Sequence, residues 1–203
     1  FDTPLLLSRN DGLSIEQAFI KRTMDIFVSI AMLVITSPIF LVTALAIKLY
    51  DGGPVFFYQE RCTKDGKVFS ICKFRSMIVD AEKNGTSVPA TERDPRITPV
   101  GNIIRKLRID ELPQLLNILK GEMSLVGPRP ERIEHVHLYS ESIPEFSYRM
   151  KVKGGLTGYA QVYGKYNTTA YDKLKMDLMY IQNYSVLLDI EILFKTVKIL
   201  FEK

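Results

Sequence analysis

The sequence has few residues of the types that build metal clusters, disulfide frameworks or nucleic-acid grooves. Among its 203 residues there are no Trp, two Cys and two His. Two cysteines cannot form a disulfide framework, so we expect reduced thiols in a cytoplasmic setting. His135 and His137 lie two positions apart and would not share a helical face, which argues against a transition-metal site. The absence of Trp and of a basic, aromatic groove pattern argues against a nucleic-acid partner.

The composition is that of one compact domain with clustered positive charge. Hydrophobic residues make up 46% of the chain and charged residues 25%, which is enough to build one good core. The formal net charge is +4, and the basic residues occur in groups. Such groups favour a phosphate-bearing ligand or an anionic surface. The opening residues lack a starting Met and read as a linker entered mid-chain, so we interpret the sequence as the C-terminal part of a longer protein.

A linker with a short amphipathic helix is expected over residues 1–18, and a long apolar segment follows it. From residue 23 to residue 47 the only charged side chain is Asp25, and this run is long enough to cross a bilayer. Basic residues flank both ends, so the positive-inside rule assigns no orientation.

The middle of this segment carries a helix-breaking pair, Ser37-Pro38. Proline removes a helix hydrogen bond and kinks the chain, and a neighbouring serine can satisfy the freed carbonyl. A bent helix over residues 19–50, entering and leaving on the same membrane face, explains these features together. An ordinary membrane-spanning helix stays open as the alternative.

The remaining residues, 51–203, are expected to form the domain outside the membrane. Two β-prone runs at 55–59 and 68–74 flank Asp65-Gly66, which predicts a β-hairpin. The run 153–165 is rich in glycine and indicates tight turns or close approach of the backbone to a ligand. An amphipathic helix is expected at the C-terminus, suited to core packing or to a membrane interface.

Two adjacent carboxylates, Asp110-Glu111, stand between a cluster of three cations and an apolar helical pattern. We predict that Asp110 is the N-cap of a helix that ends at Gly121, with Pro113 in its first turn. The helix dipole and the cations would keep both carboxylates ionised. An ionised carboxylate among cations suits a nucleophile or a metal ligand, but the same pattern is also typical of a simple helix cap.

Four cations outside that cluster suit phosphate binding. Lys73 and Arg75 lie beside a serine at the end of the second predicted strand. Arg129 stands between two prolines that restrict its direction, and Arg96 belongs to a polar, proline-broken loop. Solvated strand ends, a rigid turn and a soluble loop are the alternative interpretations.

Taken together, eight motifs in this order resemble those of the bacterial sugar transferases, the monotopic phosphoglycosyl transferases that begin glycan assembly on a polyprenyl phosphate. The resemblance covers about residues 19–203. Its motifs are KRTMDI (21–26), SP (37–38), QER (59–61), KFRSM (73–77), DPRIT (94–98), IDELPQ (109–114), LVGPRP (125–130) and GLTG (155–158).

The resemblance implies an enzyme that transfers a sugar 1-phosphate from a UDP-sugar to undecaprenyl phosphate and releases UMP. It implies Asp110 as the nucleophile that forms a covalent phosphosugar intermediate, and Glu111 as a ligand of Mg²⁺. The implied phosphate-binding residues are Lys73, Arg75, Arg129, Arg96 and Lys165.

The resemblance also implies a fold and a location. The fold would be α+β, mostly helical with short β-hairpins, with a re-entrant membrane helix broken at Ser37-Pro38 and interfacial amphipathic helices. The protein would be monotopic in the bacterial inner membrane, with its catalytic domain on the cytoplasmic face. The products would enter exopolysaccharide, capsule, O-antigen or glycoconjugate synthesis.

Three positions depart from the common family pattern, and several properties stay open. Ile109 stands where Ser or Thr often precedes the Asp, Tyr159 replaces a frequent Trp, and Lys165 replaces an Arg and loses its bidentate geometry. A non-catalytic membrane scaffold is the alternative function, and it predicts the loss of a carboxylate or clamp residue. The sequence does not determine the sugar, the pathway or whether the protein is a homo-oligomer.

Overall fold

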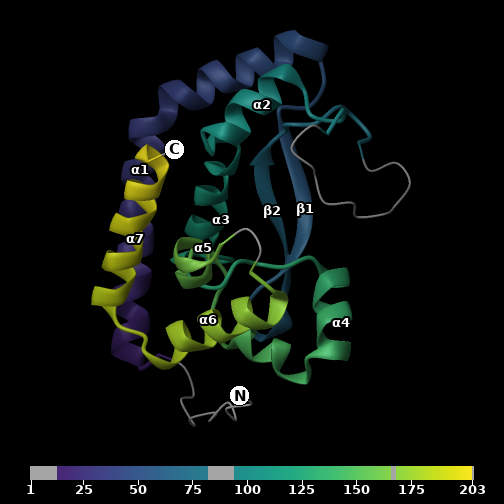
Figure 1. The fold of residues 1–203 in the computed structure, drawn as a ribbon. Coiled ribbons are helices and arrows are strands. Elements are labelled where there is room, and N and C mark those ends of the chain that lie inside the picture. Colours follow the sequence, from purple (N-terminus) through teal and green to yellow (C-terminus); the bar gives the residue numbers. More distant parts are fainter. Residues whose placement is uncertain (1–12, 82–93, 166–167, 203) are drawn as a thin grey trace.

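The computed structural model describes residues 13–81, 94–165 and 168–202, and its fold is α+β and mostly helical, as predicted (Figure 1). In chain order the helices and strands are α1 (Ile15–Asp51), β1 (Phe56–Cys62), η1 (Lys64–Gly66), β2 (Val68–Phe74), α2 (Pro99–Lys106), η2 (Ile109–Glu111), α3 (Gln114–Lys120), β3 (Ser124–Val126), α4 (Ile133–Ser142), η3 (Pro144–Lys151), β4 (Gly155–Thr157), α5 (Tyr159–Tyr163), α6 (Ala170–Gln182) and α7 (Val186–Phe201).

The short helix and the apolar segment expected from the sequence form one helix, α1, of 37 residues. Its first turn is closed by a capping box between Ser14 and Gln17. Pro38 lies in its interior, and Figure 1 shows α1 bending between its purple first half and its blue second half. The Ser37 Oγ atom donates to the Val34 carbonyl at 2.8 Å, which is the carbonyl that Pro38 leaves without a helical partner. The predicted compensation by Ser37 is therefore confirmed.

The surface of α1 is the reverse of that of a helix in a water-soluble protein. Five of its six buried residues are polar, and large apolar side chains such as Phe27 (70% exposed) and Ile35 (71%) face outward. The buried set is Lys21, Asp25, Ser29, Thr36, Thr43 and Ile47. Within the described ranges, α1 is the one helix whose length and composition would allow it to cross a membrane.

The predicted hairpin is present as β1 and β2, which pair antiparallel from Phe56↔Phe74 to Cys62↔Val68. Asp65 and Gly66 adopt positive φ values of 57° and 70° in the connection, as the Asp-Gly signal predicts.

The second strand pair was not predicted, and it is parallel rather than a hairpin. β3 pairs with β4 through Ser124↔Gly155 and Val126↔Thr157. Glycine permits this pairing because a Cβ atom on Gly155 would lie 2.1 Å from the Gly127 nitrogen. The glycine-rich run therefore brings two backbone segments together.

The main core lies between α3, β3 and the two C-terminal helices. Its most deeply buried members include Ile118, Met123, Leu174 and Ile192. Figure 1 shows α7 beside the first half of α1. Helix α7 buries Ile192 fully but leaves Phe194 73% exposed, so it packs on the core with one face and presents apolar side chains on another.

Candidate active site

The two carboxylates stand on η2, a single turn of 3₁₀ helix between α2 and α3. Arg108 precedes it in a left-handed conformation, with φ 58°, which costs energy for a residue with a Cβ atom. The prediction that Asp110 is a helix N-cap is wrong. Helix α3 begins at Gln114, because Pro113 has no N–H with which to continue an α-helical ladder back to Ile109. Its predicted end at Gly121, with φ 85°, is confirmed.

Glu111 is held by cations from two separate elements. Its Oε1 atom accepts a hydrogen bond from Arg129 Nη2 at 2.7 Å and contacts Lys73 Nζ at 3.4 Å. The Arg108 Nη1 atom lies 4.0 Å from Oε2. Burial by itself would raise the pKa of Glu111, but Arg129 and Lys73 more than offset it and hold that pKa well below its usual range. Glu111 is thus ionised, as predicted.

Asp110 differs from its neighbour. Within the part of the chain that the structure describes, its carboxylate makes no hydrogen bond and no ion pair. Burial, followed by repulsion from Glu111, raises the pKa of Asp110, while Lys73 and Arg105 oppose that rise. The direction is opposite to the one expected from the flanking cations, since burial was not visible in the sequence. The pair therefore consists of one carboxylate fixed among cations and one that is unengaged.

Asn117 brings Lys73 to this pair by joining α3 to the strand that carries the lysine. Its Nδ2 atom donates to the Ser70 carbonyl at 2.8 Å, and its Oδ1 atom accepts from the Cys72 N–H at 2.9 Å. Both ends of the amide are satisfied in a side chain that is only 2% exposed. Lys73 directly follows Cys72, so this junction fixes the start of the lysine side chain.

Arg129 is held through its backbone. Arg149, which is buried, donates from Nη2 to the Arg129 carbonyl at 3.0 Å and forms a salt bridge with Asp177 at 2.7 Å. The Asp177 partner makes Arg149 a fixed donor, so the turn that presents the Arg129 guanidinium cannot shift freely.

Arg61 belongs to the same cationic group but was missed as a site residue. It donates from Nη1 to the Pro130 carbonyl at 3.2 Å, next to Arg129. Burial, and then the proximity of Arg129, lower the pKa of Arg61 to about 10. The signal available in the sequence was the motif QER (59–61), whose arginine was assigned no role.

In the part of the chain that the structure describes, three predicted phosphate-binding residues have recorded partners other than the two carboxylates. Arg75 donates from Nη1 to Asp51 Oδ2 at 2.6 Å and from Nε to the Pro54 carbonyl at 2.6 Å, and its Nη2 atom bonds Asp51 Oδ1. Arg75 therefore closes the turn after α1, and its role in phosphate binding stays a prediction. Arg96 is paired with Asp94 at 2.6 Å.

The third of these residues is Lys165, which follows α5. Its backbone N–H donates to Thr168 Oγ1 at 2.7 Å. In the described ranges, no ion pair joins its ammonium group to either carboxylate.

The carboxylate oxygens of the site could bind a magnesium ion only together with oxygen atoms from a substrate. In the described residues, no three His, Cys, Asp or Glu side chains converge as a metal cage. Mg²⁺ does not require one, because it binds one or two carboxylates together with waters and substrate phosphates. The unengaged Asp110 carboxylate and the Oε2 atom of Glu111 meet that description, whereas Oε1 is taken by Arg129 and Lys73.

Comparison with known proteins gives a family match over nearly the whole chain. The family model described as bacterial sugar transferase matches residues 16–203. The chain is 47% identical over 184 residues to the UDP-N-acetylgalactosamine-undecaprenyl-phosphate N-acetylgalactosaminephosphotransferase of Aeromonas hydrophila. The aligned region covers 89% of this chain and 43% of that protein.

Two further relatives differ in length. The UDP-glucose:undecaprenyl-phosphate glucose-1-phosphate transferase of Escherichia coli K12 is 42% identical over 202 residues, covering 97% of this chain and 42% of that protein. The exopolysaccharide production protein PSS of Rhizobium leguminosarum bv. phaseoli is 41% identical over 186 residues, covering 88% of this chain and 93% of that protein. The chain thus spans less than half of the two longer relatives and nearly all of the shorter one.

Proposed function

Because the chain belongs to the family of bacterial sugar transferases, we propose that it transfers a sugar 1-phosphate from a UDP-sugar to undecaprenyl phosphate and releases UMP. The names of two relatives specify UDP-sugar donors and undecaprenyl phosphate, and a third name specifies exopolysaccharide production. The observation that carries the proposal is the contrast between Asp110, which is unengaged, and Glu111, which is fixed by Arg129 and Lys73. A diphosphate can approach an anionic nucleophile only where cations offset the repulsion.

In the proposed first step, an Asp110 carboxylate oxygen attacks the β-phosphorus of the donor. A bond forms between that oxygen and phosphorus, the bond from phosphorus to the bridging oxygen breaks, and UMP leaves with the electron pair. In the second step, a phosphate oxygen of undecaprenyl phosphate attacks the same phosphorus and frees the Asp110 carboxylate. Dividing the reaction in this way lets a soluble donor and a lipid acceptor use one site in turn.

The chain's own residues supply charge and orientation. Arg129 and Lys73 would bind the non-bridging phosphate oxygens, and Arg61 would add positive potential behind Arg129. Glu111 is the proposed ligand of Mg²⁺, through its Oε2 atom. The ion would neutralise charge on the diphosphate when bound.

The test of the nucleophile is trapping of the intermediate. With Mg²⁺ and a UDP-sugar but no lipid acceptor, intact-protein and peptide mass spectrometry should find a phosphosugar on Asp110. Asp110→Asn should lose the adduct and release UMP at least about 10³-fold more slowly, as for the loss of other nucleophiles. Asp65→Asn is the matched control, because Asp65 is exposed and left-handed, a conformation that Asn tolerates.

A direct transfer from donor to lipid, with both carboxylates acting only as metal ligands, is the competing mechanism. The adjacency of two carboxylates near one diphosphate suits it equally well. It requires both substrates at once, so UMP would be released only when acceptor is present and no adduct would form. Normal UMP release by Asp110→Asn would exclude Asp110 as the nucleophile. A panel of UDP-sugars assayed for UMP release would identify the donor sugar.

We propose that the protein is monotopic in the bacterial inner membrane, with the site on the cytoplasmic face. The outward apolar surface of α1, its bend and the Ser37 bond to Val34 support this placement. Both native cysteines are buried, so single cysteines introduced at residues 17 and 52 can be labelled selectively. Both should react from the cytoplasmic side. Reaction from opposite sides of the membrane would instead indicate an ordinary spanning helix.

A further inference from the structure

The active site takes its two carboxylates and its main cation from two different chain segments. Asp110 and Glu111 stand directly before α3, whereas Arg129 follows β3. The 2.7 Å contact between Glu111 and Arg129 joins them. The position of α3 relative to β3 therefore sets the spacing between the carboxylates and their main cation.

Arg22 of α1 holds the first of these segments. Its Nη1 atom donates to the Ile118 carbonyl at 2.6 Å, and its Nη2 atom donates to the Leu119 carbonyl at 2.7 Å. These carbonyls belong to the last turn of α3, where a cation is favoured, and the Ile118 carbonyl also accepts the Gly121 N–H at 2.9 Å. The two bonds use two nitrogen atoms of one planar guanidinium, a fork whose geometry the single ammonium nitrogen of lysine does not reproduce. Arg22 thus fixes the end of α3 opposite the carboxylates.

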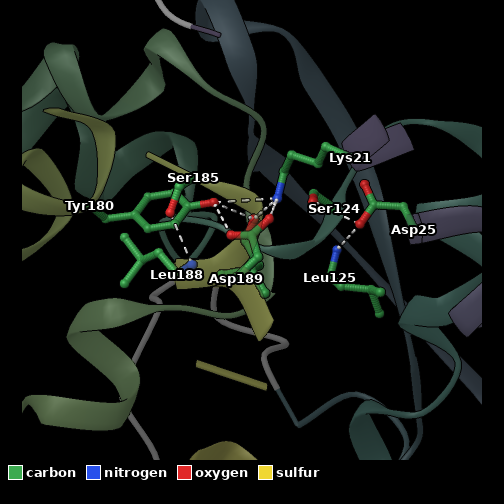
Figure 2. Close-up of polar contacts among 9 residues, drawn as sticks. Lys21, Asp25, Ser124, Leu125, Tyr180, Ser185, Leu188 and Asp189 are labelled. Carbon is green, nitrogen blue, oxygen red and sulfur yellow. Dashed lines mark hydrogen bonds and ion pairs between the residues drawn. The ribbon is translucent and has the colours of Figure 1, made fainter. Parts of the chain in front are cut away.

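Asp25 of α1 holds the second segment. Its Oδ1 atom accepts hydrogen bonds from the Ser124 Oγ and the Leu125 N–H, each at 3.0 Å. Figure 2 shows Asp25 turned toward Ser124 and Leu125. The carboxylate is 3% exposed, so water cannot replace these bonds readily. Ser124 begins the strand that leads to Arg129.

A third contact from the same turn of α1 reaches β3 and α7. Lys21 donates from Nζ to the Val126 carbonyl at 2.9 Å and to Asp189 Oδ2 at 2.5 Å, and Figure 2 shows it beside Tyr180 as well. One turn of a mostly apolar helix thus buries Lys21 and Asp25, and partly buries Arg22, against the two segments of the site. Apolar side chains could anchor a helix without the desolvation cost of these charges.

From this arrangement we propose that Arg22 and Asp25 are positioning residues for sugar-phosphate transfer, and the inference rests on the function proposed above. They hold α3 and β3 at one separation, and so set the distance between Asp110 and the cations that receive the diphosphate. The apolar helix is then part of the catalytic framework as well as the anchor.

The kinetic test uses the whole chain in lipid nanodiscs with Mg²⁺ and the UDP-sugar turned over by the wild type. Arg22→Met and Asp25→Leu should slow the first-step rate constant about 10–100-fold, the loss expected for a displacement of about 1 Å. The KM for the donor and the final adduct per folded protein should stay within about threefold, since binding groups and nucleophile are intact. Glu16→Leu repeats the carboxylate-to-leucine change at an exposed position of α1 and should keep the wild-type rate.

The conservative variants separate positioning from simple anchoring. Asp25→Asn retains the acceptor oxygen and should keep most of the wild-type rate, whereas Arg22→Lys loses the fork and should recover only part of it. A merely structural role would lower the melting temperature and the amount of adduct together and leave the rate constant of the folded fraction unchanged. That result would overturn the proposal.

Hydrogen exchange tests the same idea without any turnover. Amides of residues 109–114 should exchange faster in Arg22→Met, and amides of residues 124–129 faster in Asp25→Leu, each relative to Glu16→Leu. Unchanged exchange in both segments would refute the positioning role even in an active enzyme. If the wild type released UMP from none of the UDP-sugars tested, the proposed function would be rejected. The exchange measurement would still decide whether Arg22 and Asp25 position the two segments.

Discussion

The buried ion pair between Lys21 and Asp189 gives a quantitative test of how α1 is attached to the rest of the protein. Their side chains are 9% and 0% exposed, and the two charged atoms lie 2.5 Å apart. Lys21→Met would leave Asp189 buried without its cation. Removal of one partner of a buried pair typically costs about 3–5 kcal/mol. We expect the lower value, about 3 kcal/mol, because the Tyr180 hydroxyl still donates to Asp189 Oδ1 at 2.7 Å.

For a chain of this size, about 3 kcal/mol corresponds to a fall in melting temperature of roughly 6–12 °C. Circular dichroism of the protein in detergent micelles would measure it. Lys198→Met is the matched control, since Lys198 forms an exposed pair with Glu202 at 71% and 61% exposure. Exposed pairs contribute about 0–1 kcal/mol, so the control should shift the melting temperature by less than about 4 °C.

The double variant Lys21→Met with Asp189→Leu removes both charges together. It should melt within about 4 °C of the wild type, because a buried pair replaced by apolar side chains is often close to neutral. Tyr180 can still donate to the Val126 carbonyl, which lies 3.2 Å away. A single variant that melts like the Lys198 control, or a double variant as unstable as the two single losses added together, would refute this account.

Three further predictions concern the glycines, the nucleophile and the bend. Gly158→Ala places a Cβ atom 2.1 Å from the Gly127 carbonyl oxygen and should lower the free energy of unfolding by about 1–3 kcal/mol, measured by thermal melting; a wild-type melting temperature would contradict the close packing. Arg105 lowers the pKa of Asp110, and the attack needs the ionised carboxylate. Arg105→Gln should therefore move the acid limb of the pH profile of the single-turnover rate to higher pH. An acid limb that does not move would mean that another group titrates. Pro38→Ala restores the backbone N–H that can donate to the Val34 carbonyl, so labelling at residue 52 should move to the opposite side of the membrane. Unchanged labelling would show that the proline is not required for the bend.

Features with a local cause could be predicted from the sequence. The Asp65-Gly66 turn and the Gly121 cap depend on backbone conformations that particular residues favour, and both occur where predicted. The bond from Ser37 to Val34 is likewise a consequence of the neighbouring proline. The grouping of Lys73 and Arg129 around Glu111 came from the family resemblance rather than from spacing.

Features that depend on partners far apart in the chain could not be predicted. The pairing of Arg75 with Asp51, 24 positions away, is an example, because neither residue's sequence neighbours indicate it. The strands β3 and β4 have three residues each, too few for an alternating pattern, and their pairing depends on the close approach of Gly155 to Gly127. The raised pKa of Asp110 depends on burial that only the packed structure defines.

The bend in α1 limits how far each half of the helix can extend along one direction. A straight helix of 37 residues would rise about 55 Å, far more than the roughly 30 Å thickness of a bilayer's hydrocarbon layer. At about 1.5 Å per residue, the arm beyond Pro38 to Asp51 rises only about 20 Å, and the arm from residue 23 to the proline rises little more. Neither arm alone matches the depth of that layer. A single imino acid thus divides the apolar part of this helix into two arms, each of which is shorter than the hydrocarbon layer is thick.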